Sequence, residues 1–267
     1  MAKVSAYIIA YNEEDKIEAA LASVAWADEV LLADSYSTDR TAEIAGQRGA
    51  RVVQIPFEGF GKLRNTVLSH CTHEWIFSLD SDERCTAEAR DEILRTITTP
   101  DAADAYLVPR RNLFMGRWIR FSGWYPNYRQ PQLFRRGRMR YTEEAVHEGY
   151  VLDGRLGKLE HAIWQMPFRT LSQVIDKMNR YSTLGAGKRL EKGMGASMWR
   201  ALLRGGWAFV RMYILRLGFL DGWAGFVIAL SNFEGTFYRY AKLTELARGW
   251  PDAAPPVAEL RRPEVKR

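Results

Sequence analysis

The feature that most constrains this chain is the alternation of short apolar runs with amphipathic segments through its first hundred residues. Short apolar runs are typical of buried strands, and apolar residues at intervals of three and four positions are typical of helices. Repeated strand–helix units predict an α/β fold with a mainly parallel sheet covered by helices. We expect strands at Val4–Ala10, Glu29–Ala33, Arg51–Ile55 and Glu74–Leu79, and helices at Glu13–Val24, Thr41–Arg48, Gly61–Ser69 and Thr86–Thr98.

The pattern changes after this region. Residues 105–157 carry many aromatics, arginines and glycines, and their short strand-like pieces lie at Tyr106–Pro109 and Gln132–Arg135. From about Leu171 the pattern becomes helical, and we expect helices at Leu171–Leu184, Met198–Leu217 and Trp223–Leu246. We therefore predict an α/β domain over residues 1–168, a helical extension over 169–248, and a tail over 249–267.

Composition limits the class of protein. The chain has 267 residues, of which 47% are hydrophobic, and its net charge is +6, so a folded protein with an anionic partner is expected. Its two cysteines form no metal-type or redox-type pair and are typical of a reducing compartment. The first residues lack the apolar run of a signal peptide. The most apolar stretch, residues 205–233, contains charged residues, so we expect no spanning helix there.

Polar clusters follow three of the predicted strands. They are Tyr11-Asn12-Glu13, residues 34–39 and Asp80-Ser81-Asp82-Glu83. Because ligands bind at the carboxyl ends of parallel strands, these clusters are expected to surround one crevice. Asp80 and Asp82 can approach one hard cation, since Mg²⁺ and Mn²⁺ prefer oxygen ligands. A capped turn before the next helix would explain the same two residues without a metal.

Four motifs in order resemble glycosyltransferase family 2, which has the GT-A fold. They are the strand ending in Tyr-Asn-Glu, the strand ending in Asp34 with a Ser-Thr-Asp turn, Arg64-Asn65, and the Asp80-x-Asp82 motif. Further segments resemble bacterial lipopolysaccharide inner-core β-glucosyltransferases, among them Phe57–Gly61, Leu133–Arg136, Val146–Glu148, Lys177–Ser182 and Leu217–Gly222. The sequence departs from that pattern at Ser35, where many members have a second Asp, and at Lys62-Leu63-Arg64.

The resemblance implies a division of labour. Residues 1–168 would be the catalytic domain, with the donor site in 1–100 and the acceptor region in 101–168. Tyr11, Glu13 and Asp34 would hold the nucleoside of a nucleotide sugar. Arg64 would neutralise the diphosphate or orient a carboxylate, Asp82 would bind Mg²⁺ or Mn²⁺, and Asp80 would support the metal or contact the ribose. For each of these residues an ordinary structural role competes with the functional one.

An inverting transfer also needs a carboxylate that takes the proton of the acceptor hydroxyl. The resemblance implies Glu148 for this role, with Glu143 and Glu144 as rivals. It further implies a late metal-binding histidine, for which His161 is the first candidate and His147 the alternate. A lone histidine is more often structural, so the two interpretations of His161 weigh about equally.

The helical extension mixes tryptophan, tyrosine, leucine and arginine between Trp199 and Arg216, which suits a membrane interface or packing against the catalytic domain. The resemblance implies an enzyme that moves glucose from a UDP-sugar to a lipopolysaccharide core, and together with the helical extension it predicts a cytoplasmic protein, peripheral on the inner membrane. A polyprenyl-linked acceptor is the alternative. A nucleic-acid-binding module and an inactive scaffold are alternatives of other classes. No nucleic-acid motif is present, and Asp80 and Asp82 disfavour a scaffold.

Overall fold

The computed structural model describes residues 2–143, 149–195 and 197–249. Its main element is a seven-stranded sheet in the order β12-β6-β9-β4-β1-β2-β3. Strand β9 runs antiparallel to β4 and β6, and the other pairs are parallel. The strands are β1 (Val4–Ala10), β2 (Glu29–Asp34), β3 (Arg51–Gln54), β4 (Trp75–Asp80), β6 (Ala105–Leu107), β9 (Leu133–Arg135) and β12 (Leu156–Lys158).

Helices cover both faces of this sheet because alternate side chains of β1 point to opposite faces. Val4, Ala6, Ile8 and Ala10 belong to a core that also contains apolar residues of α1, α2 and α4. Tyr7 and Ile9 belong to a second core with residues of α3. These helices are α1 (Glu14–Val24), α2 (Thr41–Gln47), α3 (Phe60–His70) and α4 (Ala87–Thr98).

Two small sheets complete the α/β part. The first has the order β5-β13-β7-β8 and consists of β5 (Glu83–Arg84), β13 (Ile163–Gln165), β7 (Arg110–Phe114) and β8 (Arg117–Ile119). The second pairs β10 (Met139–Tyr141) with β11 (Tyr150–Leu152). Through β13, the first small sheet connects the residues after β4 to the C-terminal helices.

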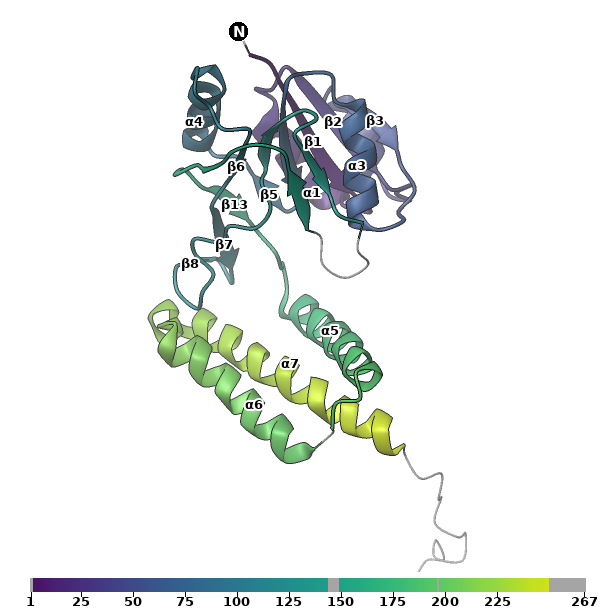
Figure 1. The fold of residues 1–267 in the computed structure, drawn as a ribbon, viewed down its shortest axis with the longest axis vertical. Helices are drawn as coiled ribbons and strands as arrows, with labels where there is room; N and C mark the ends of the chain where they lie inside the picture. Colours follow the sequence, from purple (N-terminus) through teal and green to yellow (C-terminus); the bar gives the residue numbers. More distant parts are fainter. Residues whose placement is uncertain (1, 144–148, 196, 250–267) are drawn as a thin grey trace, which may run out of the picture.

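The C-terminal helices form a layer beyond the α/β part (Figure 1). They are α5 (Leu171–Glu191), α6 (Met198–Val210), a π-helical turn (Arg211–Leu215), a 3₁₀ turn (Gly218–Asp221) and α7 (Gly222–Arg248). Helix α7 packs along both α5 and α6. In the described part of the chain, no single helix is long and apolar enough to cross a membrane. One pair of helical segments has the length and composition for a membrane span only when the two are taken together. They are Met198–Leu215 and Gly218–Arg248, and the pair is bent by 71°.

The predicted α/β fold with a C-terminal helical extension is confirmed. The four strands and four helices expected in the first hundred residues are present within about one residue at each end. Helix α5 runs seven residues beyond the predicted Leu184. The middle region is the least well predicted, because β7, β8 and β10–β13 are short strands without a clear alternation.

Candidate active site

The carboxyl ends of β1, β2 and β4 lie side by side. In the sheet register, Ala10 is opposite Asp34 and Ile9 is opposite Asp80. The loops that follow these residues therefore leave the sheet at the same edge. The three polar clusters predicted from the sequence are brought together there, which is the usual ligand position in a parallel α/β sheet.

Asp34 organises the turn after β2. It is fully buried, and its carboxylate accepts hydrogen bonds from the Ser37 backbone N–H at 3.0 Å and the Ser37 hydroxyl at 2.5 Å. The Ser37 hydroxyl in turn accepts from the Asn12 N–H at 2.9 Å, and the Thr38 N–H donates to Asn12 Oδ1 at 2.8 Å. These bonds fix the loops after β1 and β2 to each other.

Two tyrosines stand exposed on these joined loops. The side chains of Tyr11 and Tyr36 are each 59% exposed, although large aromatics are normally buried. Tyr36 has a positive φ of 60°, and its N–H donates to Gln54 Oε1 at 3.3 Å. Exposed rings at a ligand-binding edge can stack on a planar base. Glu13, beside Tyr11, forms an ion pair with Lys16 at 2.5 Å.

Arg64 orients Asp80. The guanidinium is 4% exposed and donates to Asp80 Oδ1 at 2.7 Å and to the Ser78 hydroxyl at 3.1 Å. It also lies over the Tyr141 ring, with 5.4 Å between Cζ and the ring centroid. Burial raises the pKa of Asp80, but the charge and hydrogen bond of Arg64 outweigh it and leave the pKa below its usual value. Of the two roles predicted for Arg64, this geometry favours orientation of a carboxylate.

Asp82 has the opposite electrostatic setting. Burial and the negative charges of Glu83 and Asp80 raise the pKa of Asp82 to about 7. The hydrogen bond that Gln165 Nε2 donates to Asp82 Oδ2 is long, at 3.3 Å, and offsets only part of this rise in pKa. When neighbouring anions disfavour the ionised form of a carboxylate, a cation bound beside it stabilises that form strongly. The electrostatics therefore fit a cation at Asp82.

Behind these two residues, Glu83 holds the loop in shape. Its side chain is fully buried and accepts from Arg110 Nε at 2.5 Å, Gln132 Nε2 at 2.8 Å and the Asp80 N–H at 3.0 Å. Arg110 is itself 2% exposed. The sequence places Glu83 in the same polar cluster as Asp80 and Asp82 but assigns it no role, and its three partners give it a structural one.

The two carboxylates suit Mg²⁺ or Mn²⁺ bound together with a diphosphate. Mg²⁺ is usually held in proteins by one or two carboxylates and by phosphate oxygens of the substrate. Asp80 and Asp82 supply such carboxylates. Within residues 2–143, 149–195 and 197–249, no three His, Cys, Asp or Glu side chains converge on a metal position.

His161 does not lie beside Asp82. In the antiparallel β5–β13 pair, Gln165 is opposite Glu83, and His161 precedes β13 at the other end. The His161 N–H donates to Glu92 of α4 at 2.8 Å. Glu148, Glu144 and His147 lie outside the described residues. Glu143 is described, and its Oε1 accepts from Asn65 Nδ2 at 3.4 Å.

Two contributors to this site lie far from the strand-end clusters in the sequence. Gln165 reaches Asp82 from β13, and Lys177 of α5 lies near enough for the Asp82 charge to affect it. Both are more than eighty positions from Asp82 in the sequence. Gln165 belongs to no motif, and Lys177 opens the Lys177–Ser182 segment, to which the resemblance gives no role at this site. The helical layer thus contributes to the surroundings of the strand ends.

Comparison with known proteins decides the family. The sequence model described as "Glycosyl transferase family 2" matches residues 5–150, which is more than half of the chain. This chain belongs to glycosyltransferase family 2. The matched region contains every strand-end cluster described above, so the predicted family and its transferase activity are confirmed.

Two relatives of this family 2 glycosyltransferase agree with that assignment. An uncharacterized glycosyltransferase of Rickettsia felis is 29% identical, over 92% of this chain and 90% of the relative. The lipopolysaccharide core biosynthesis glycosyltransferase LpsC of Rhizobium meliloti is also 29% identical, over 90% of this chain and 91% of LpsC. Both alignments therefore extend beyond the family match into the helical layer.

Among solved structures, glucosyl-3-phosphoglycerate synthase of Mycobacterium tuberculosis in complex with Mn²⁺, UDP and glucosyl-3-phosphoglycerate is similar to part of the chain. The sequence identity is 26% and the TM-score 0.36, over 42% of this chain and 44% of that one.

Proposed function

We propose that this glycosyltransferase moves glucose from UDP-glucose to a lipopolysaccharide core acceptor with the help of Mg²⁺ or Mn²⁺. The observation that carries the proposal is the meeting of Asp34, Asp80 and Asp82 at one sheet edge, with Asp82 disfavoured as an anion. The similarity to LpsC along nearly the whole chain supports the acceptor class. The resemblance to inner-core β-glucosyltransferases supports the donor.

Each residue then has a role in donor binding. Tyr11, Glu13 and the turn that Asp34 anchors would hold the nucleoside. Asp80, oriented by Arg64, and Asp82 would hold the divalent cation, which supplies electrostatic stabilisation of the leaving diphosphate. A hydroxyl of the acceptor would lose its proton to Glu148, the base that the resemblance implies, and attack the anomeric carbon on the face opposite the diphosphate. The bond between the anomeric carbon and the diphosphate oxygen would break, and UDP would leave.

The test of this function is donor-dependent labelling of a defined acceptor. Radiolabelled UDP-glucose, Mg²⁺ and a core-truncated lipopolysaccharide should give a labelled glycolipid with inverted anomeric configuration. Transfer only to a polyprenyl-linked sugar would replace the acceptor, and a retained configuration would exclude the proposed mechanism. Asp91→Asn, on an exposed turn of α4, is the matched control for Asp82→Asn.

We also propose that the helical layer attaches the enzyme to the inner face of the cytoplasmic membrane. Its exposed side chains include Trp199 at 74%, Leu203 at 69% and Trp223 at 79%. The same segment contains four arginines, at positions 200, 204, 211 and 216. Exposed tryptophans beside basic residues suit an anionic membrane interface, with about 1 kcal/mol per basic group near the surface.

Vesicle sedimentation tests this attachment. The protein should pellet with phosphatidylglycerol vesicles at low salt, and Trp199→Ala with Trp223→Ala should reduce the bound fraction several-fold. Leu94→Ala, on the exposed surface of α4 and outside the helical layer, is the control. A protein that stays in the supernatant at low salt would contradict the proposal.

A further inference from the structure

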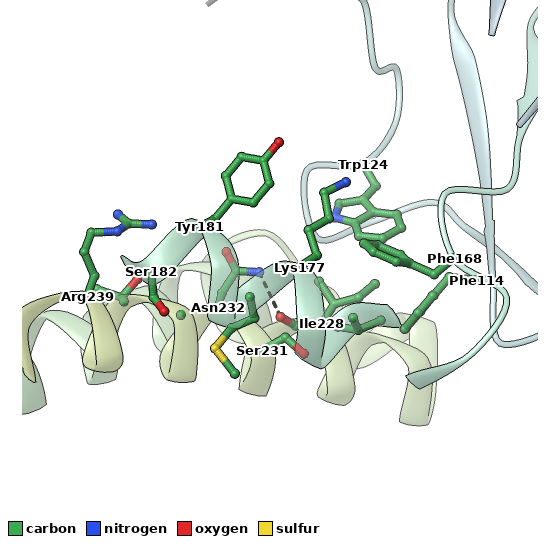
Figure 2. Close-up of a pocket in the computed structure, with 14 residues that line it drawn as sticks. Phe114, Trp124, Phe168, Lys177, Tyr181, Ser182, Ile228, Ser231, Asn232 and Arg239 are labelled. Carbon is green, nitrogen blue, oxygen red and sulfur yellow. Dashed lines mark hydrogen bonds between the residues drawn. The ribbon is translucent and has the colours of Figure 1, made fainter. Parts of the chain in front are cut away.

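A pocket of about 300 Å³ lies between α5 and α7, next to β7 and the β13–α5 connection. This volume is at the lower end of the range for small-molecule sites, about 300–1,000 Å³. One end is lined by the rings of Phe114, Trp124 and Phe168, and the other by polar groups that include Ser182 and Arg239 (Figure 2). The pocket therefore suits a ligand with both an apolar surface and a polar group.

Small residues keep this space open between the helices. A Cβ atom on Gly185 of α5 would lie 2.8 Å from Nε of Arg239, which is closer than real contacts allow. A Cβ on Gly235 of α7 would meet the Met178 side chain at 3.3 Å. Gly185 thus lets the Arg239 side chain pass along α5 and present its guanidinium at the pocket.

The charges at the pocket are unbalanced. The residues that line it include Lys177 and Arg239 but no carboxylate. In the part of the chain that the structure describes, neither cation forms a salt bridge, and Nε of Arg239 and of Arg189 is buried without a hydrogen-bond partner. Burial and the nearby positive charge of Arg189 lower the pKa of Arg239. Cations held together in this way are stabilised by an anion.

The pocket adjoins the donor site through the connection between β13 and α5. The Met166 N–H donates to the Asp82 carbonyl oxygen at 2.9 Å, and Phe168, two residues further on, lines the pocket. Burial and the charge of Arg129 lower the pKa of Lys177, whereas the charge of Asp82 opposes that shift, so these groups lie within electrostatic range. Its ammonium lies over the Phe168 ring, 4.9 Å from the centroid. Lys177 and Gly185 are eight residues apart on α5, or about 12 Å along the helix. Figure 2 shows Lys177, Tyr181 and Arg239 extending to the same side.

We infer that this pocket is an acceptor subsite that binds a phosphorylated sugar of the acceptor, with Arg239 at the phosphate and the aromatic rings against the sugar. This inference rests on the proposed function, because the acceptor sugar must reach the anomeric carbon near Asp82. An Arg guanidinium recognises phosphate by paired hydrogen bonds. Aromatic rings give the apolar surface that small-molecule sites use for packing.

Acceptor kinetics test the inference on the full chain. The acceptor is core-truncated lipopolysaccharide in nonionic detergent, either intact or dephosphorylated with hydrofluoric acid. Arg239→Gln should raise KM for the intact acceptor at least ten-fold, with kcat within two-fold, and should not change KM for the dephosphorylated one. Gly185→Ala, which displaces the guanidinium and favours the helix, should raise KM in the same direction. Arg248→Gln, on the exposed last turn of α7, should have no effect.

Separate readouts distinguish the possible failures. Calorimetric binding of UDP-glucose with Mg²⁺ should be the same in wild type and Arg239→Gln. If wild type binds no UDP-sugar, the proposed function fails. If donor binding and transfer are normal but Arg239→Gln has the same KM as wild type for the intact acceptor and for the dephosphorylated one, the subsite inference is overturned.

A phospholipid headgroup offers the same phosphate chemistry, so its binding is measured independently. Phosphatidylglycerol vesicles should sediment wild type and Arg239→Gln equally, because the subsite takes the phosphate of the acceptor. Loss of vesicle binding in Arg239→Gln with unchanged acceptor kinetics would assign the pocket to the membrane lipid and contradict the inference.

Discussion

Glu83 and Arg110 form an ion pair of 2.5 Å in which neither side chain is more than 2% exposed. A buried charge that loses its partner typically costs 3–5 kcal/mol. We therefore expect Glu83→Gln to lower the free energy of unfolding by about 3 kcal/mol, measured by urea denaturation. The pair also positions the Asp80–Asp82 loop, so the same variant should weaken donor binding.

The matched control for this prediction is an exposed ion pair. Arg138 and Asp153 are paired at 2.8 Å, with side chains that are 50% and 81% exposed. Pairs of this kind contribute about 0–1 kcal/mol, so Asp153→Asn should change stability little. Equal effects of the two substitutions would mean that burial of the Glu83 pair does not govern its contribution.

A second prediction concerns the division of roles within α3. Arg64→Met removes the cation that keeps Asp80 ionised, so we expect metal-dependent affinity for UDP-glucose to fall at least ten-fold in calorimetry. Lys62→Met changes an exposed cation on the same helix and should leave the affinity within two-fold. If Lys62→Met loses affinity for UDP-glucose and Arg64→Met does not, the contact with the diphosphate would be assigned to Lys62.

A third prediction concerns acid stability. Burial opposes the shift, but hydrogen bonds from Ser5, Thr72 and Arg51 hold the pKa of Glu29 at about 2. Because this pKa lies below the unfolded value of about 4.3, Glu29 stabilises the fold above that pH and loses its contribution as the pH falls towards 2. Glu29→Gln should cost about 1–2 kcal/mol at pH 7, allowing for partial exposure.

Urea titrations of both proteins at pH 7 and pH 3 check this sign. The stability difference between wild type and Glu29→Gln should narrow at the lower pH. Glu43→Gln, which removes an exposed partner of Arg40, should show no comparable change at either pH. A difference that grows on acidification would contradict the assignment.

A fourth prediction separates stability from function at Asp82. Burial and the charges of Glu83 and Asp80 disfavour its ionised form, so Asp82→Asn removes an unfavourable charge. In the presence of a chelator, the melting temperature of this variant should be no lower than that of wild type. Its transferase activity should nevertheless fall at least a hundred-fold. A variant that melts well below wild type would show that Asp82 has a structural role.

The sequence predicts the donor half of the site well because its signals are local. Each apolar strand is followed at once by its polar cluster, so the strand pattern alone places Asp34 and Asp80 at one sheet edge, and the register confirms this. For Arg64 the sequence leaves two roles open, and burial of the guanidinium against Asp80 favours one of them.

The remainder depends on contacts between distant segments. Glu83 belongs to a two-residue strand, too short for any periodicity, and its partner Arg110 follows 27 positions later. Gln165 and Lys177 approach Asp82 from elements that the sequence places in other regions. His161 stands late in the chain as the resemblance requires, but the β5–β13 register directs it towards α4.

The most direct test of the central claim is calorimetric titration of UDP-glucose into the full chain, with Mg²⁺ or with a chelator, for wild type and Asp82→Asn. The account predicts binding to wild type that requires the metal and weakens at least ten-fold in Asp82→Asn. The account would be contradicted if wild type bound UDP-glucose equally well with Mg²⁺ and with the chelator and Asp82→Asn bound it as tightly as wild type. It would also be contradicted if folded wild type bound no UDP-sugar.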